Sequence, residues 1–261
     1  MLAVDWRPLW LGYAVAAAFL LVLWLIQLRT RDAGVVDFGW AASIGGLAVW
    51  SALSGPGSDL QRVVAAALGG GWGFRLASHL LFDRVLHGEE DGRYRYLRQH
   101  WGARANAHFL WFFQAQAVLA AVLAIPFFLI AHIEAAALGV LQGVGLGVCA
   151  VALVGETVAD RQLARFRRDP TTRGTTCRVG LWRYSRHPNY FFEWLMWVGF
   201  ALVALPAPHG EWMVLLPVVM FVFLTRLTGI PYTEAQALRS RSDYREYQRT
   251  TSAFFPLPPS E

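Results

Sequence analysis

The chain has 261 residues, of which 56% are hydrophobic and 16% are charged, and its mean hydropathy is +0.37. This composition is unusual for a water-soluble domain of such length and is typical of an integral membrane protein. The formal net charge of +5 rests on 23 basic side chains, all of which are arginine. We therefore expect membrane lipids and a hydrophobic ligand as partners, and no nucleic acid.

Seven apolar segments approach the roughly 20 residues that a helix needs to cross the hydrocarbon layer of a membrane. In chain order they are Leu11–Leu28, Val36–Leu53, Val63–Phe82, Phe109–Ala131, Glu134–Val154, Tyr190–Leu205 and Trp212–Leu227. The first segment is long and lacks a clear small-residue cleavage site, so we interpret it as a permanent helix rather than a secretion signal. The sequence predicts an all-α fold, a single membrane domain over residues 1–261 with about seven transmembrane helices.

The arginines are distributed unevenly between the connecting segments. If these segments alternate sides of the membrane, twenty arginines fall on one side and only Arg7 and Arg62 on the other, while Arg75 lies within a span. Positive residues favour the cytoplasmic side, which predicts an outside amino terminus and a cytoplasmic carboxyl terminus. The cytoplasmic parts would then be two basic loops and the carboxyl-terminal tail, at residues 84–107, 159–188 and 228–261.

The chain shows no sequence pattern for a metal or a soluble-type nucleotide loop. Its seven histidines are scattered without a ligand-type pair, and Cys149 and Cys177 lack metal-like spacing, so we expect no metal and two reduced thiols. The glycines at 69–71 and Gly73 follow no strand. We interpret them as sites of close helix packing rather than as a dinucleotide fingerprint.

The strongest local signal is the stretch Gly-Leu-Trp-Arg-Tyr-Ser-Arg-His-Pro-Asn-Tyr-Phe-Phe-Glu-Trp, at residues 180–194. Pro188 favours the start of a helix, whose first backbone amides would bind an anion. The basic side chains expected beside that anion are Arg183, Arg186 and His187.

Glu193 would lie about one turn inside the membrane boundary, on the helix face that also carries Asn189. An acid at that depth is costly and therefore suggests a functional site, although a salt bridge to Arg186 is an alternative explanation.

This stretch, together with the flanking Asp160, Arg167, Glu234, Tyr244, Tyr247 and Phe254-Phe255-Pro256, resembles the steroid 5-alpha-reductase superfamily of membrane proteins. The resemblance covers roughly residues 36–256 and is strongest to a bacterial branch of the superfamily. It implies a seven-helix bundle in a bacterial inner membrane that takes NADPH from the cytoplasmic side. By the resemblance, Asp160 and Arg167 hold part of the cofactor, and Asn189 and Glu193 lie near its nicotinamide half. The other residues expected beside the cofactor are Arg183, Arg186, His187, Tyr190, Arg226 and Tyr247.

The resemblance implies reduction of a carbon–carbon double bond in a hydrophobic enone, which requires a proton donor from the protein. The steroid-reducing members use a Glu that follows a Gln, helped by a Tyr on the third span. This sequence lacks the Gln-Glu pair, and we expect Asp37, at the start of the second span, to replace the acid. Arg75, within the third span, must have a partner or line a polar cavity. Asp37 could instead cap its helix or pair with Arg75.

Two other functions remain open. The Arg-His-Pro-Asn-Tyr stretch, its Glu, the later Tyr-Arg-Glu-Tyr and a Phe-Pro ending also resemble isoprenylcysteine carboxyl methyltransferase-like membrane enzymes, which bind S-adenosylmethionine. A non-enzymatic protein that binds anionic lipids through its basic loops is the third interpretation. The spacing of Asp160 and Arg167 and the number of arginines favour NADPH.

Overall fold

The computed structural model describes residues 4–86, 90–227 and 229–260, and its regular elements within these ranges are all helices. This confirms the all-α prediction. The chain forms two compact units, Met1–Leu138 and Gly139–Glu261, which we treat separately as unit 1 and unit 2.

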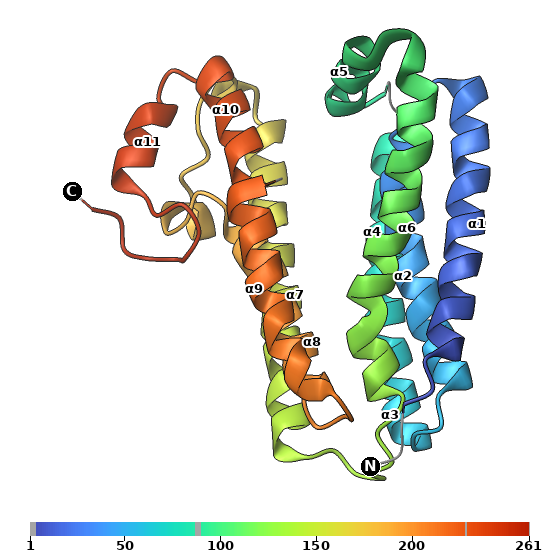
Figure 1. Ribbon diagram of the computed structural model, residues 1–261. Helices are drawn as coiled ribbons and strands as arrows, with labels where there is room; N and C mark the ends of the chain where they lie inside the picture. The colour runs from blue at the N-terminus through green and yellow to red at the C-terminus, as the bar shows by residue number, and fades with distance from the viewer. Residues whose placement is uncertain (1–3, 87–89, 228, 261) are drawn as a thin grey trace. The chain divides into compact units, whose positions relative to one another are not determined.

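Unit 1 is a bundle in which four long helical segments run side by side (Figure 1). Its helices are α1 (Arg7–Thr30), α2 (Val35–Ser54), α3 (Asp59–Ala65), α4 (Gly71–Leu80), α5 (Gly92–Trp101) and α6 (Ala105–Ile130). Two π-helical turns, Ala66–Gly70 and Leu81–Val85, lie at the two ends of α4. The core of the unit is packed with fully buried aromatic and aliphatic side chains such as Phe109, Phe113 and Leu20.

Small residues allow the helices of unit 1 to approach closely. A methyl group placed on Gly73 of α4 would lie 2.6 Å from the backbone nitrogen of Gly45 in α2. On Gly69 it would lie 2.4 Å from the Cβ of Ala48. Gly71, in contrast, has no heavy atom within 4 Å of such a group. The predicted close packing is therefore confirmed for Gly69 and Gly73 but not for Gly71.

Unit 2 is built on the long helix α7 (Val140–Arg168), which packs against α8 (Pro188–Ala204). The remaining helices are α9 (Leu215–Val222), α10 (Ile230–Ser240) and α11 (Tyr244–Thr250), and a π-helical turn covers Phe223–Leu227. The α7/α8 contact is close and depends on the missing side chain of Gly199. A methyl group placed there would lie only 2.4 Å from the Sγ of Cys149.

In the part of the chain that the structure describes, five helical segments are long and apolar enough to cross a membrane, which supports an integral membrane protein. They are Arg7–Thr30, Val35–Ser54, Gly92–Ile130, Val140–Arg168 and Gly210–Ser240. The other two expected spans are helical but do not meet both criteria: Arg75 and His79 lower the hydropathy of one, and α8 has only 17 residues. The count of seven and the orientation of the termini stay predictions.

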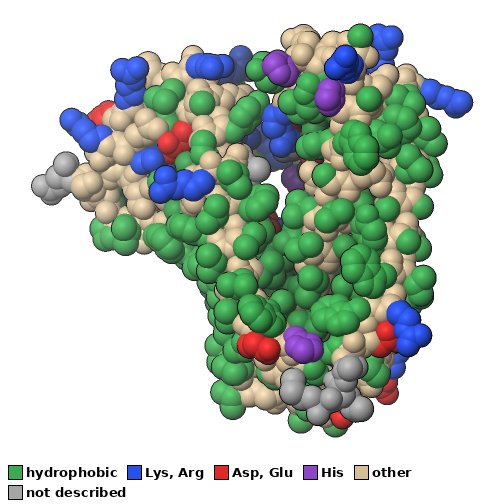
Figure 2. Space-filling model, viewed as in Figure 1, with side chains coloured by type: hydrophobic (Ala, Val, Ile, Leu, Met, Phe, Trp, Pro, Cys, Tyr) green, Lys and Arg blue, Asp and Glu red, His purple; other side chains and the backbone are tan. Residues whose placement is uncertain are grey.

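Two predicted boundaries were wrong. The fifth span does not start at Glu134 but at Val140, and its helix continues to Arg168 through the first part of the expected loop 159–188. The expected loop 84–107 contains the helix α5. Figure 2 shows hydrophobic side chains along the helices and basic side chains gathered mainly towards one end of the helices in each unit.

Candidate functional site

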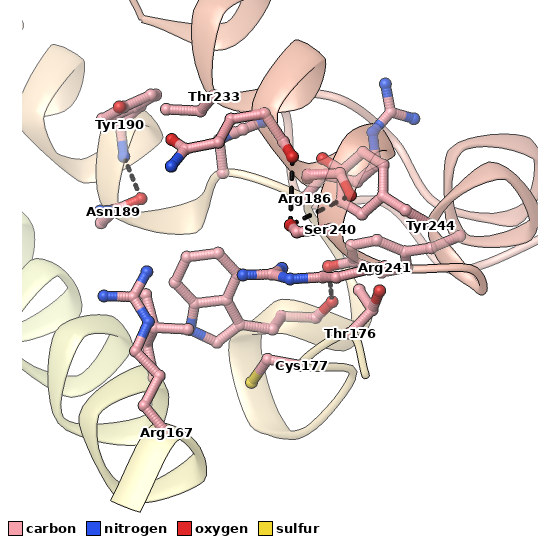
Figure 3. A pocket seen from close by; sticks show the side chains of 16 residues that line it. Arg167, Thr176, Cys177, Arg186, Asn189, Tyr190, Thr233, Ser240, Arg241 and Tyr244 are labelled. Carbon is pink, nitrogen blue, oxygen red and sulfur yellow. Dashed lines mark hydrogen bonds between the residues drawn. The ribbon is translucent and has the colours of Figure 1, made fainter. Parts of the chain in front are cut away.

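Unit 2 contains a cavity of about 220 Å³ where the end of α7, the start of α8, α10 and α11 meet (Figure 3). The cavity brings together six of the residues that the sequence predicts beside a cofactor. These are Arg167, Arg186, His187, Asn189, Tyr190 and Tyr247. Its walls combine cationic, amide and aromatic groups, a mixture that suits a ligand with both planar rings and negative charge.

Asp160 and Asn189 connect α7 to the start of α8. The side-chain amide of Asn189 donates a hydrogen bond of 3.3 Å to Oδ1 of Asp160. Arg167 follows Asp160 by seven residues, two turns along the same helix, so both point from the same side of α7. In Figure 3, Arg167 extends into the cavity from this helix. The sequence spacing therefore places these residues in one region, as expected.

The start of α8 lies at Pro188, as the sequence predicts. His187 precedes it and is buried, with its ring nearly parallel to that of Tyr190 at a centroid distance of 5.3 Å. Burial lowers the pKa of His187; the hydrogen bond and the negative charge of Glu234 oppose this shift, and Arg186 reinforces it. A neutral imidazole is thus favoured on this wall of the cavity.

Arg186 is held by groups of the protein itself. Its Nε donates to Oε1 of Glu234 at 2.7 Å, and its Nη1 donates to the backbone oxygens of Gln248 and Thr251 at 2.9 and 2.6 Å. The alternative of a salt bridge between Arg186 and Glu193 is therefore wrong. Arg186 lines the cavity, but its main contacts fasten the tail to the segment that precedes α8.

Glu193 lies one turn into α8, where its Oε1 accepts a hydrogen bond of 2.9 Å from the indole nitrogen of Trp197. Glu193 is not among the residues that line the cavity. Its proposed contact with a cofactor stays a prediction.

The carboxyl-terminal tail packs against the segment 180–187. The hydroxyl of Tyr247 donates to the backbone oxygens of Trp182 and Ser185, and the hydroxyl of Ser185 donates to the backbone oxygen of Phe254. Burial, followed by the neighbouring Tyr244, raises the pKa of Tyr247. The tail is thus a wall of the cavity rather than a simple surface helix.

Arg183 and Arg226 lie away from this cavity. Arg183 is exposed at the end of the short turn Gly180–Arg183. Arg226 lines a separate cavity of about 340 Å³, together with Phe221 and Phe254. The structure does not bring these two arginines together with the residues named above.

Several lining residues were not among the predicted cofactor contacts. They include Arg241, which follows α10, and Cys177, which is buried. Tyr244, at the start of α11, was named only as part of the family resemblance. The sequence of the tail did not indicate which of its side chains would face a cavity.

A second group of polar residues lies in unit 1, around Asp37. This residue occupies the first turn of α2 and accepts hydrogen bonds from the hydroxyl of Tyr94 at 2.6 Å and from Nη2 of Arg93 at 3.0 Å. Tyr94 is buried, with 4% of its surface exposed, and it packs against Phe109 and Phe112. Asp37 is therefore held as an acceptor rather than as the hydrogen-bond donor that we expected.

Tyr94 was not identified from the sequence, because we looked for a tyrosine on the third span. Arg75, which together with Asp37 was the other candidate for a catalytic role in the membrane, is exposed on α4. Two groups that hydrogen-bond to Asp37, from Arg93 and Tyr94, come from α5.

Residues 23–251 match the DUF1295 family, which is described as a protein of unknown function. No curated protein and no solved structure gives a significant match. The DUF1295 family is associated with steroid 5-alpha-reductase-like membrane proteins, which agrees with the resemblance at the level of the family. Because the match covers most of the chain, this membrane protein belongs to the DUF1295 family.

Proposed function

We propose that the chain is a membrane-bound reductase that uses NADPH to reduce a carbon–carbon double bond in a hydrophobic, lipid-like enone. One observation carries the proposal: six residues expected beside NADPH line a single cavity, among them Arg167, Asn189, Tyr190 and Tyr247. These four come from α7, α8 and α11, which are far apart in the sequence.

The residues of this cavity fit a dinucleotide. Arg167 and Arg241 form no ion pair with a carboxylate among the residues that the structure describes, so both can donate to phosphate oxygens. The indole of Trp182 and the ring of Tyr190 offer planar surfaces for the rings of the ligand. When bound, the cofactor would supply a hydride.

The reduction also requires one proton. The hydroxyl of Tyr94, which a hydrogen bond to Asp37 holds in place, can transfer its proton to a substrate oxygen. The phenolate that this leaves is stabilised by the guanidinium of Arg93, 5.3 Å from the ring of Tyr94, and not by the carboxylate. Arg93 neutralises part of the charge on Asp37. In this proposal Tyr94 takes the role for which the sequence suggested Asp37 alone, and Asp37 positions it.

The charge of the cavity also separates the reductase from the methyltransferase. S-adenosylmethionine carries a single carboxylate and a positive sulfonium, whereas NADPH carries several negative phosphates. Arginines without a carboxylate partner attract NADPH more strongly than they attract S-adenosylmethionine. A lipid-binding protein without catalytic activity would require neither Arg167 nor Asn189 in this arrangement.

Equilibrium binding of NADPH and of S-adenosylmethionine to the detergent-purified protein tests the proposal. We expect NADPH to bind, and Arg167→Ala to weaken it by roughly 10- to 100-fold, as for a charge-assisted hydrogen bond. Arg168→Ala is the matched control, since Arg168 is exposed on the same helix and does not line the cavity. Binding of S-adenosylmethionine alone, or NADPH binding that is unchanged in Arg167→Ala, contradicts the proposal.

A further inference from the structure

The separate cavity that Arg226 lines in unit 2 has no role in the proposed function. Its volume is about 340 Å³, and it shares no lining residue with the cavity around Arg167. Its walls come from the end of α9, the π-helical turn that follows, the first residue of α10 and tail residues 252–255. Sites for small molecules have volumes of roughly 300–1,000 Å³, so this cavity is large enough for a ligand of its own.

Most of the wall of this cavity is apolar. The rings of Phe221, Phe254 and Phe255 line it and contact one another at centroid distances of 5.2 to 5.9 Å. Trp194 of α8 packs against all three rings, and its indole nitrogen donates to the backbone oxygen of Pro217 at 2.9 Å. The aromatic wall therefore offers no free polar group of Trp194 and suits a hydrocarbon chain.

A single cation completes the wall. Arg226 is exposed and, within the described ranges, forms no ion pair with an Asp or a Glu, and neither of these residue types lines the cavity. The other polar side chains of the wall are the hydroxyls of Thr225 and Ser252, and that of Thr225 donates to the backbone oxygen of Phe221 at 2.6 Å. The positive charge of Arg226 is therefore uncompensated, which favours an anion beside it.

Arg226 also lies where the apolar sequence ends. Residues 212–225, between Glu211 and Arg226, contain no charged side chain, and they belong to a segment that is long and apolar enough to cross a membrane. An arginine at the end of such a segment extends its guanidinium to the membrane interface, where the charged groups of lipids lie. The aromatic wall is then on the side of the lipid chains.

We propose that this cavity binds an anionic lipid, whose oxyanion contacts Arg226 and whose hydrocarbon chain lies against the rings of Phe221, Phe254 and Phe255. The oxyanion is the phosphodiester of a phospholipid or the carboxylate of a fatty acid, because both accept two parallel hydrogen bonds from a guanidinium. A zwitterionic lipid fits less well, since its own cation already compensates its phosphate. The inference is independent of the proposed reductase activity.

A dinucleotide does not match this cavity. The wall has one cationic side chain and no amide side chain, whereas several phosphates and polar rings require more partners. A lipid has one charged end and a long apolar part, as the wall does. The division of the wall into one guanidinium and three phenyl rings is thus the feature that selects the class of ligand.

A lipid in this cavity would hold the tail against the last span. From the other side, the tail is already fixed to the segment 180–187: the hydroxyl of Ser185 donates to the backbone oxygen of Phe254, and the backbone nitrogen of Arg186 donates to that of Ser252, both at 2.8 Å. Because the ligand contacts only the folded arrangement of tail and span, its binding should raise the melting temperature.

Native mass spectrometry of the full chain in detergent, titrated with phosphatidylglycerol, phosphatidylcholine or oleate, tests the inference. We expect phosphatidylglycerol to bind about 5-fold more tightly than phosphatidylcholine, the contribution of one arginine near a membrane surface. Arg226→Gln should abolish this preference, and Arg226→Lys should retain part of it because the charge returns without the planar fork. Arg239→Gln removes an exposed charge of α10 that does not line the cavity, and it should change nothing.

Ala253→Leu tests the apolar part of the cavity without a change of charge. Ala253 is half-buried and lines the cavity, so the larger side chain takes space from the hydrocarbon chain. This variant should weaken phosphatidylglycerol and oleate alike. Its melting temperature without added lipid shows whether the protein is folded, and unchanged affinities in the folded variant would overturn the inference.

The lipid arms also distinguish the source of the oxyanion. Binding of phosphatidylglycerol that depends on Arg226 assigns it to a phospholipid, and such binding of oleate alone assigns it to a fatty acid; both results support an anionic lipid. Equal affinities for the two phospholipids, together with oleate binding that is unchanged in Arg226→Gln, overturn the inference. So does a loss of NADPH affinity in Arg226→Gln with no loss of lipid affinity, which would assign Arg226 to the cofactor. A wild type that binds lipid as expected but no NADPH contradicts the proposed function alone.

Discussion

The hydroxyl of Tyr94 donates a hydrogen bond of 2.6 Å to Oδ1 of Asp37, a residue that lies 57 positions earlier in the chain. The pair joins α5 to the first turn of α2. A phenol whose position a carboxylate fixes can act as a proton donor where a cation, here Arg93, stabilises the phenolate that forms. The carboxylate alone, already an acceptor from Arg93, is less suited to that role.

Tyr94→Phe and Asp37→Asn should both lower turnover, by about 10²- to 10⁴-fold as for the loss of a general acid, while the affinity for NADPH stays unchanged. Turnover is measured as NADPH oxidation in the presence of a panel of hydrophobic enones, and affinity by equilibrium binding. Tyr96→Phe, which alters an exposed tyrosine of the same helix, serves as the control. Loss of NADPH binding in Asp37→Asn would show that Asp37 is structural.

Gly73→Ala should destabilise unit 1, because the added methyl group would lie within 2.7 Å of backbone atoms of Gly45, which cannot move aside. We expect a loss of about 1–3 kcal/mol in the free energy of unfolding, as for an overpacked core. Gly71→Ala, on the same helix with open space around it, should be neutral or more stable by about 0.5–1 kcal/mol. Thermal unfolding in detergent measures both, and a similar loss for the two variants would contradict the packing described here.

Glu234→Ala should destabilise unit 2 more than a substitution that removes an exposed charged side chain. It would leave Arg186 without its partner, and the side chains of this pair are only 11% and 13% exposed. Breaking a buried ion pair in this way costs about 3–5 kcal/mol. Glu246→Ala is the control, since Glu246 is 60% exposed and lies 3.6 Å from Arg178, and it should cost less than about 1 kcal/mol. Equal melting temperatures of the two variants would refute this role of Arg186.

The stability of unit 2 should fall at mildly acidic pH because of His187. Burial lowers the pKa of His187 below its ordinary value of 6.5, so the unfolded chain binds a proton at a pH where the folded chain does not. The stabilisation is therefore fully present above about pH 6.5 and decreases as the pH falls from there through the lower pKa of the folded state. The melting temperature should decline in this range for the wild type and less steeply for His187→Gln. His100→Gln, at an exposed position, should behave like the wild type.

Local features of the structure could be predicted from the sequence, and contacts over long separations could not. Pro188 placed the start of α8, and the spacing of Asp160 and Arg167 placed both on one side of α7. These features depend on helix geometry over a few residues.

The partners of Asp37 and Arg186 depend on packing between helices and segments that lie 48 to 65 residues apart. Hydropathy also placed the end of the fifth span at Val154, although α7 continues to Arg168. Leucine, alanine, glutamine and arginine are strong helix formers, so the helix continues after the apolar pattern has ended.

Binding of NADPH to unit 2, in the cavity around Arg167, can be located by hydrogen exchange of the protein in nanodiscs, with and without NADPH. This measurement reports both binding and the segments involved. We expect slower exchange in segments 172–178 and 185–191, with no change in α1. Protection by S-adenosylmethionine alone, or NADPH-dependent protection confined to segments outside this cavity, would contradict it.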